Sequence, residues 1–415
     1  MGTAPMDDPR INGERLWASL MEMARIGATP AGGVCRLALS DFDKEARDLF
    51  IAWCEDAGCA ISVDRIGNIF ARRAGGDDGL APVMTGSHLD TQPTGGKFDG
   101  AYGVLAGLEV MRTLNDYGVE TKAPFEAIAW TNEEGCRFTT SMAGSGVFAG
   151  IYTIEDIRAS TDADGLKFGE ELERIGYAGA EPVGGRAVAA YFEAHIEQGP
   201  FLEAENKTIG VVTGGQGKRS FEITVTGRES HAGTTPMPAR RDALMGAVRM
   251  IAEVEALALA KAPEGVGTVG MIEAKPNSRN TIPGSAFFSA DLRHPDPAAL
   301  DEMAAGLRQS CARIAEAGGL AYEMTEVTHY PATKFDEACV SAVRGAAERL
   351  GYSHRDIVSR AGHDACSMAR TAPAAMIFVP CENGISHAEI ENATPDDLAA
   401  GCNVLLHAML QIDGS

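Results

Sequence analysis

The sequence predicts an α/β protein built from two domains. Its 415 residues are far more than the roughly 150 at which a single domain is the usual expectation. Strand-like apolar runs alternate with helical patterns along much of the chain, as in sheets whose faces are covered by helices. Residues 213–328 read differently, in the order β-α-β-β-α-β of a split βαβ sandwich. We therefore expect a larger domain of residues 1–212 and 329–415, with a second domain inserted at 213–328.

The elements of the larger domain follow one another in a clear order. Two helical patterns, ERLWASLMEMARIG and SDFDKEARDLFIAWCEDAG, precede a hairpin-like alternation in CAISVDRIGNIFARRAG. Strands are expected at PVMTGSH, FEAIAWTNEE, VAAYFEAHIEQG and AAMIFVPCE, with a helix at GVLAGLEVMRTLNDYG. In the insert, the expected strands are RSFEITVTG, GTVGMIEA, SAFFSADLR and LAYEMTEV, and the expected helices are RRDALMGAVRMIAEVEALA and PAALDEMAAGLRQSCARIAEAG.

Composition excludes several classes of partner. The chain has 36 basic and 58 acidic residues and a formal net charge of −22, which repels nucleic acid and anionic membrane surfaces. Hydrophobic residues make up 45%, yet no run approaches the ~18 apolar residues of a membrane span. Nine cysteines without a C-x-x-C motif suggest reduced thiols. We expect a cytoplasmic protein without a targeting segment.

The stretch GSHLDTQPTGGKFDGAYG directly follows a predicted buried strand. His88 could ligate a metal through a neutral ring nitrogen, and Asp90, two residues later, could orient that ring. Asp99 lies in a glycine-rich loop before a helix, where a carboxylate could bridge two cations. Alternatively, both aspartates serve only as turn and helix-capping residues.

Other strand ends carry complementary groups. Glu133 and Glu134 end the strand FEAIAWTNEE, His195 ends a third strand and has Gln198 nearby, and His387 lies in the late motif ISHAEI. Three histidines, an aspartate and a glutamate form a plausible site for two zinc-like or manganese-like ions. In such a site Asp99 would bridge the ions, and Glu133 would take a proton from the attacking water.

The remaining histidines carry weaker signals. His231, in GRESHAGTTPM, is expected to be exposed near the start of a helix. His363, in AGHDA, is interpreted as shaping a loop, with Asp364 capping a helix. The others are expected to be surface or packing residues: His294, His329, His354 and His407.

With these residues in order, the chain resembles the hydantoinase/carbamoylase branch of the dinuclear zinc amidohydrolases, which are structurally related to aminoacylases and carboxypeptidases. The motifs are GSHLDTQPTGGKFDGAYGVLAGLE, TNEEGCRF, HIEQGP, SHAGTTPM and GHDA, and the match covers nearly the whole chain. The resemblance implies a metallopeptidase-like α/β catalytic domain with an inserted ferredoxin-like α+β dimerisation domain. It implies two divalent ions per subunit (Zn, or Mn, Co or Ni), with Glu133 as general base. The implied metal ligands are His88, Asp99, Glu134, His195 and His387.

The resemblance also implies a small ureido acid as substrate. Family members hydrolyse N-carbamoyl-L-amino acids or N-carbamoyl-β-alanine to the amino acid, ammonia and carbon dioxide; others act on allantoate. An aminoacylase or peptidase activity, or a silent ligand-binding homologue, are the further alternatives.

The residues expected to bind this substrate are Gln198, Gln216, His231, Asn280, Arg293 and Gly362. Arg293 would hold the substrate carboxylate through two hydrogen bonds, although a surface salt bridge with Asp291 is the alternative. His231 would stabilise the oxyanion. In the family the inserted domain pairs two subunits, and the equivalents of His231, Asn280 and Arg293 reach the metal site of the partner.

Overall fold

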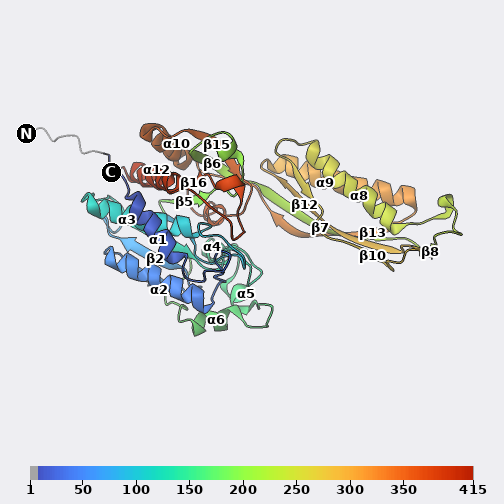
Figure 1. The fold of residues 1–415 in the computed structure, drawn as a ribbon, viewed down its shortest axis with the longest axis horizontal. Helices are drawn as coiled ribbons and strands as arrows, with labels where there is room; N and C mark the ends of the chain where they lie inside the picture. The colour runs from blue at the N-terminus through green and yellow to red at the C-terminus, as the bar shows by residue number, and fades with distance from the viewer. Residues whose placement is uncertain (1–7, 415) are drawn as a thin grey trace, which may run out of the picture. The chain divides into compact units, whose positions relative to one another are not determined.

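The computed structural model describes residues 8–414, which divide into two compact units. Unit 1 holds the chain up to Gly214 and again from Lys334, and unit 2 is the continuous segment Gly215–Thr333. The sequence placed the insert at 213–328, but strand β13 (Ala321–Tyr330) continues past that limit. Figure 1 labels the elements of both units. Strands and helices mix in the way the sequence indicated, so the predicted α/β class is confirmed.

Unit 1 is organised around a nine-stranded sheet in the order β1-β2-β4-β3-β5-β16-β6-β14, with β15 paired to β6. Its four central strands β4, β3, β5 and β16 are parallel, whereas β1, β2 and β6 pair antiparallel. The carboxyl ends of the four parallel strands therefore meet at one edge. The strands are β1 (Ala60–Val63), β2 (Ile69–Arg73), β3 (Val83–His88), β4 (Phe125–Trp130), β5 (Ala190–Ile196), β6 (Ile209–Gly215), β14 (Thr333–Lys334), β15 (His354–Ser359) and β16 (Ala374–Val379).

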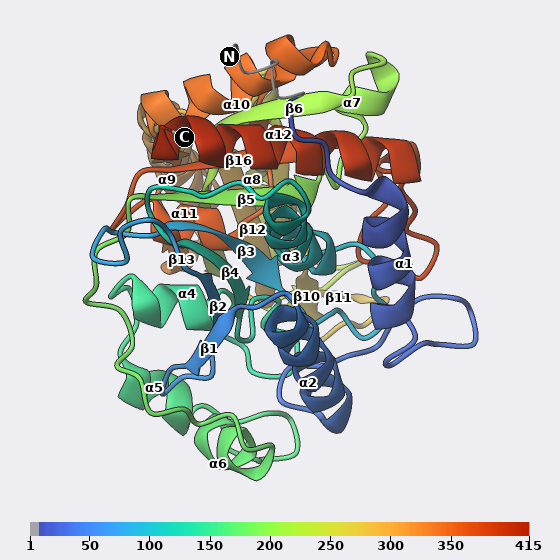
Figure 2. The same ribbon diagram turned by 90° about the vertical axis from the view of Figure 1, so that its left-hand side faces the viewer.

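Helices cover both faces of this sheet, because every residue of β3, β4, β5 and β16 is buried. Helices α1, α3, α10 and α12 pack together over β3, β5 and β16, and α4 and α11 form a second group; Figure 2 looks onto α1, α3 and α12. The helices are α1 (Gly13–Met23), α2 (Asp41–Asp56), α3 (Ala101–Asp116), α4 (Ala143–Phe148), α5 (Ile154–Ala159), α6 (Phe168–Arg174), α7 (Phe201–Ala204), α10 (Glu337–Leu350), α11 (Asp364–Met368) and α12 (Pro395–Asp413), with a 3-10 turn η2 (Glu382–Gly384).

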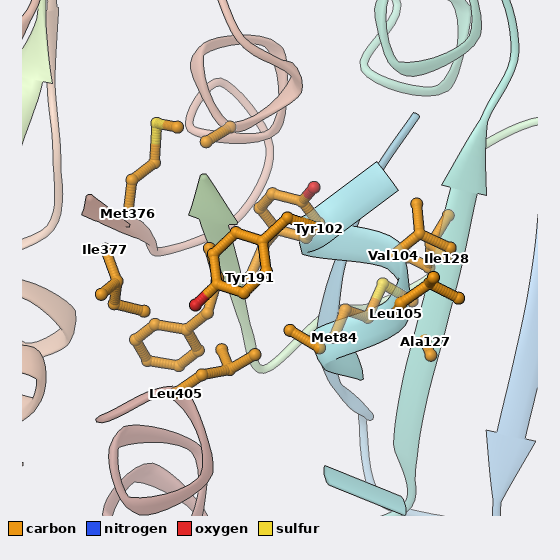
Figure 3. Packing of buried hydrophobic residues seen from close by; sticks show 14 of the residues in the cluster. Met84, Tyr102, Val104, Leu105, Ala127, Ile128, Tyr191, Met376, Ile377 and Leu405 are labelled. Atoms are coloured by element: carbon orange, nitrogen blue, oxygen red, sulfur yellow. The ribbon is translucent and has the colours of Figure 1, made fainter. Parts of the chain in front are cut away.

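The core of unit 1 lies between the sheet and these helices. Figure 3 shows Tyr102, Val104 and Leu105 of α3 among side chains from β3, β4 and β5. Tyr191 of β5 is fully buried, and its hydroxyl donates to the Gly86 carbonyl of β3 at 2.9 Å while accepting from the Trp130 indole. The polar ends of these aromatic residues are therefore satisfied inside the core. This packing fixes the strand ends that carry the polar motifs.

Unit 2 is an antiparallel sheet with two long helices. The sheet order is β10-β12-β7-β13, with β9 also paired to β12, and β12 alternates between buried and half-buried residues as expected for a sheet covered on one face. The predicted strand GTVGMIEA is broken into β9 and β10, which pair with different parts of β12. The elements are β7 (Gly217–Thr226), β8 (Ser230–His231), η1 (Met237–Ala239), α8 (Ala243–Leu259), β9 (Val266–Thr268), β10 (Ile272–Lys275), β11 (Thr281–Ile282), β12 (Ser285–His294) and α9 (Pro297–Gly318). No helix in the described part of the chain is long and apolar enough to cross a membrane.

Candidate metal centre

The edge where the parallel strands of unit 1 end gathers the polar residues that the sequence singled out. His88 is the last residue of β3, and His195 is the last but one of β5. Glu133 and Glu134 follow β4, and His387 lies in the connection between β16 and α12. Asp99 precedes α3. Residues far apart in the chain therefore meet because their strands are parallel neighbours.

These side chains form two groups of metal-ligating atoms that share one residue. His88, Asp99 and His195 make one group, and Asp99, Glu134 and His387 make the other, with the ligand atoms of each group within 4.8 Å of one another. Asp99 Oδ1 lies 3.2 Å from His195 Nε2, and Asp99 Oδ2 lies 3.1 Å from His387 Nε2. Because each carboxylate oxygen faces a different group, Asp99 has the geometry of a bridging ligand.

The two buried histidines are held in one ring orientation. His88 Nδ1 donates to the Asp90 carbonyl at 2.8 Å, and His195 Nδ1 donates to the Ile196 carbonyl at 2.9 Å. Both carbonyls can only accept, so each ring keeps a proton on Nδ1 and turns Nε2, the atom that a metal would take, toward Asp99. Gly100 makes room for His88: its φ is 66°, and a Cβ there would lie 2.3 Å from the ring.

Asp90 acts differently from its predicted role. Its carboxylate was expected to orient the His88 ring, but Oδ1 lies 3.9 Å from Nδ1, and the backbone carbonyl of Asp90 makes the hydrogen bond instead. The carboxylate accepts the backbone N–H groups of Glu133 and Glu134, each at 3.2 Å. Asp90 therefore positions the pair of adjacent acids as well as the histidine.

Glu133 lies beside the metal-ligating groups without belonging to either. Its Oε2 is 3.5 Å from His88 Nε2, and the residue is 8% exposed. Burial, together with the charges of Asp364 and Glu134, raises the pKa of Glu133 well above its usual value. A buried carboxylate with a raised pKa next to a metal site is suited to accept a proton.

The charges of the cluster fit a divalent cation. Burial and the charge of Asp99 raise the pKa of Glu134 to about 7, and within residues 8–414 Glu134 Oε1 is buried without a hydrogen-bond partner. The other oxygen, Oε2, accepts from Gln92 Nε2 at 2.6 Å. A cation would neutralise these crowded acids, and a set of imidazole and carboxylate ligands suits zinc, manganese or cobalt.

Gln198 reaches the same place from the turn after β5. Its Nε2 donates to Asp99 Oδ2 and to Ser386 Oγ, at 3.1 Å each. Among the described residues nothing donates to its buried Oε1. Its backbone is left-handed, with φ of 55°, which is a strained conformation of the kind found at functional sites. Gly362, also in unit 1, lies against Met142, whose Cε is 3.2 Å from the position of a Cβ on this glycine.

The other predicted substrate-binding residues lie in unit 2, at two separate places. His231 in β8 pairs in register with Thr281 of β11, and Asn280 accepts the Ala232 N–H through its backbone carbonyl, so these two side chains share one end of the unit. Arg293 pairs with Lys218, eight residues beyond Ser285, the first residue of β12. At about 3.3 Å per residue this separation is about 26 Å. The three residues therefore cannot hold one small substrate within one copy of unit 2.

Arg293 also forms the salt bridge with Asp291 that was the alternative to binding the substrate. Its Nε donates to Asp291 Oδ1 at 2.7 Å, and Lys218 Nζ lies 3.2 Å from the other oxygen of Asp291. Burial raises the pKa of Asp291, but the hydrogen bonds and charges of Arg293 and Lys218 outweigh this effect, so the pKa is lowered overall. Gln216 lies next to this end of β12, because it directly precedes β7.

Sequence reasoning missed part of the cluster. The His363 ring packs edge-on against His195, with centroids 4.5 Å apart. Asp364 does not cap α11 through its side chain as predicted: the carboxylate that accepts from the helix backbone is Glu193 Oε2, 2.7 Å from the Ala365 N–H. Glu193 stands two residues before His195 in β5, so both side chains point to the same face of the sheet. That spacing was a usable signal.

A parallel α/β sheet that brings histidines and carboxylates to one edge, with an antiparallel unit inserted in the chain, defines a metal-dependent hydrolase. The chain belongs to Peptidase family M20/M25/M40, which matches residues 84–411, and within it to the amidases of the hydantoinase/carbamoylase group. The crystal structure of such an amidase from Burkholderia multivorans is 59% identical, with a TM-score of 0.94, and the match covers 99% of this chain and 100% of that one.

Two relatives carry names that describe a reaction. The N-carbamoyl-L-amino-acid amidohydrolase of Rhizobium meliloti is 51% identical, over 98% of both chains. The ureidoglycolate hydrolase of Oryza sativa subsp. japonica is 35% identical, over 97% of this chain and 85% of its own. The chain is therefore similar to enzymes that are named for two different ureido substrates.

Proposed function

We propose that this protein hydrolyses the ureido C–N bond of N-carbamoyl-L-amino acids, or of N-carbamoyl-β-alanine, releasing the amino acid, ammonia and carbon dioxide. The observation that carries the proposal is the position of Glu133 beside two metal-ligating groups that share Asp99. A shared carboxylate between two such groups supports two divalent ions per subunit, zinc or else manganese, cobalt or nickel. The 51% identical amidohydrolase supports the choice of substrate.

Each residue near the centre has a definable task. His88, Asp99, Glu134, His195 and His387 would hold the metal ions, which when bound supply a Lewis acid and lower the pKa of water. Glu133 takes the proton of the attacking water and delivers it to the leaving nitrogen. Asp90 keeps Glu133 in place through its backbone. Gln198 has a buried oxygen that can accept from the ureido N–H groups.

The substrate carboxylate and the oxyanion need further donors, and unit 2 offers them. Arg293 carries a planar cation suited to a carboxylate, and it pairs with Lys218 near Gly215, where the chain enters unit 2. His231 and Asn280 are exposed at the other end of the unit. We propose that Arg293, with Gln216, binds the substrate carboxylate and that His231 and Asn280 reach the metal centre of a partner subunit. The two places do not act on one substrate from the same copy of unit 2, because a small substrate cannot span about 26 Å.

A homodimer follows from this division, and the surface of unit 2 supports it. β10 is an edge strand of the sheet, and its first residue Ile272, together with the preceding Met271, is more than half exposed. On α8, Met245, Val248 and Leu259 are exposed as well. An exposed sheet edge beside an apolar helix face is suited to bury itself against a second copy. We propose a cytoplasmic location, since none of the nine cysteines, all within the described residues, forms a disulfide.

The main alternative is a linear ureide such as allantoate, which the 35% identical ureidoglycolate hydrolase favours. Ammonia release is to be measured on metal-loaded protein with several N-carbamoyl-L-amino acids, N-carbamoyl-β-alanine, allantoate and an N-acetylated amino acid side by side. We expect the highest kcat/KM for an N-carbamoyl amino acid. A higher value for allantoate would establish the alternative, and preference for the acetylated compound would make the protein an aminoacylase.

A further inference from the structure

We propose that Glu391 is a positioning residue that locks the bridging carboxylate Asp99 and the loop of His387 into one rigid unit. The inference rests on the metal ligands of the proposed function, and it adds a residue that no part of that function includes. Glu391 lies four residues after His387 and is 3% exposed. It is too far along the chain from Asp99 to be linked to it by local structure.

The contacts of Glu391 reach both ligands. Its Oε1 accepts the backbone N–H groups of Phe98 at 3.0 Å and Asp99 at 3.1 Å. Its Oε2 accepts from Ser386 Oγ at 2.8 Å, and Ser386 directly precedes His387. One carboxylate therefore holds the backbone of the bridging ligand with one oxygen and the loop of another ligand with the other. Hydrogen bonds to a buried carboxylate are strong, so they fix the positions of the groups that donate them.

Ser386 extends the contact to the reactive atoms. Its Oγ lies 3.3 Å from Asp99 Oδ2, and it also accepts from Gln198 Nε2. The hydroxyl has a single proton, and the shorter distance to Glu391 favours donation there. Asp99 Oδ2 is then left to Gln198 and to the group formed with Glu134 and His387. By accepting the Ser386 proton, Glu391 leaves the Oδ2 lone pairs of Asp99 available to a metal ion.

Gly96 provides independent support, because the residue that Glu391 packs against has no side chain. A Cβ on Gly96 would lie 2.1 Å from Glu391 Oε1, 2.2 Å from its Cδ and 2.4 Å from its Cβ. The φ of Gly96 is not in the left-handed region, so the glycine is required by this side chain and not by a turn. The loop of Asp99 is thus shaped around the Glu391 carboxylate.

The test measures metal binding, with Co²⁺ and Zn²⁺ as probes and no substrate present. Glu391→Leu removes both acceptor oxygens, and we expect Co²⁺ affinity to fall about 10- to 100-fold, the usual loss for partners of metal ligands. The absorption spectrum of bound Co²⁺ should change, because the ligand geometry is altered. Gly96→Ala should reproduce the loss, since the added methyl group displaces the carboxylate. Asp396→Leu, at an exposed acid five residues after Glu391, is the matched control and should bind Co²⁺ as the wild type does.

The variant Glu391→Gln keeps the size of the side chain and removes its charge. In Glu391→Gln, Oε1 still accepts both backbone N–H groups, but Nε2 donates to Ser386 Oγ and turns the serine proton toward Asp99 Oδ2, so affinity should fall less than in Glu391→Leu. Wild-type affinity in both Glu391→Leu and Gly96→Ala would overturn the proposal, and so would a Gln variant as weak as Leu. If Glu391→Leu does not fold by circular dichroism, Gly96→Ala and Glu391→Gln decide. A wild type that binds metal but hydrolyses no ureido acid would refute the proposed function and leave this inference intact.

Discussion

The backbone N–H of Glu133 donates to Oδ1 of Asp90 across 3.2 Å, which ties the end of β4 to the end of its parallel neighbour β3. The next N–H, that of Glu134, donates to the other oxygen of the same carboxylate. The proposed base and a proposed metal ligand thus depend on one side chain that touches neither reacting atoms nor metal. A change at Asp90 should therefore disturb catalysis without removing a catalytic group.

Asp90→Ala is expected to lower kcat about 10- to 100-fold, the usual loss for partners that support a metal site. Asp90→Asn keeps one acceptor oxygen but places an amide against the second N–H, so its kcat should fall between wild type and Ala. Steady-state kinetics on metal-loaded protein measure this. Asp164→Asn, on an exposed loop, serves as control. Unchanged kcat in Asp90→Ala would show that the acid pair is held by other contacts.

Glu133→Gln should retain its metal ions and lose at least ~100-fold in kcat, because the amide cannot take the proton of water. Metal content by elemental analysis separates this result from a loss of ligands. Glu134→Gln is the informative comparison, since it should lose metal as well as turnover. Near-normal turnover of Glu133→Gln would assign the base to another residue.

Removal of the metal should abolish activity, and its return should depend on pH. Burial opposes protonation of His195, but the hydrogen bond and charge of Asp99 outweigh it and raise its pKa to about 9. The hydrogen bond that His387 donates to Asp99 likewise raises the pKa of His387 to about 8. Metal must displace these protons, so affinity for Zn²⁺ should rise as pH rises through 8 to 9. Titration calorimetry in buffers of different ionisation enthalpy should detect the released protons, and pH-independent binding would contradict the ligand assignment.

The metal-free protein should show the opposite dependence in its stability. A histidine whose folded pKa lies above its usual 6.5 stabilises the fold fully below that pH, and the contribution is lost as pH rises through the folded value. The Tm of chelator-treated protein should therefore fall between pH 6.5 and about 9. His387→Ala should show a smaller fall, because it lacks one of the two histidines. An equal fall in both proteins would assign the effect to other groups.

Mixing inactive variants should reveal which residues act across the dimer. Glu133→Gln subunits re-associated with Asn280→Ala subunits should regain activity, up to about a quarter of the wild-type value per subunit at random pairing. Glu133→Gln mixed with Arg293→Ala is the comparison, because Arg293 lies about 26 Å along β12 from the end of unit 2 that carries Asn280. Recovery in the second mixture would place Arg293 in the partner's site, and recovery in neither would make each subunit self-sufficient. Arg293→Lys should raise KM, since the charge stays but the paired hydrogen bonds are lost.

The sequence indicated those site residues that end apolar strands. His88, His195 and the pair Glu133 and Glu134 follow buried runs, and parallel strands bring such ends together by geometry. Glu391 gave no comparable signal, because an acid in a polar loop reads as a solvated residue until its partners are known, whereas Glu193 was indicated only by its spacing of two residues from His195 in β5. Two of the partners of Glu391, Phe98 and Asp99, lie 293 and 292 residues earlier in the chain.

The arrangement within unit 2 was predicted less well, for a different reason. The sequence identified both Asn280 and Arg293 as polar groups near strands, and the resemblance grouped them at one site. Periodicity gives which face a residue occupies but not how far along the sheet it lies. The ten-residue strand β12 separates the two by its own length, and only the register with β7 makes this visible.

The position of β16 between β5 and β6 in the sheet has a consequence for biosynthesis. The ribosome delivers the chain from its N-terminus at about 5–20 residues per second, so β5 and β6 emerge long before the strand that belongs between them. Unit 2, a continuous segment, can fold in that interval, while unit 1 waits with an open gap in its sheet. His387 and Glu391 follow β16 in the chain, so a nascent polypeptide that has not reached them cannot assemble the centre around Asp99. The metal centre is thereby completed only after β16 and the loop of His387 have been synthesised.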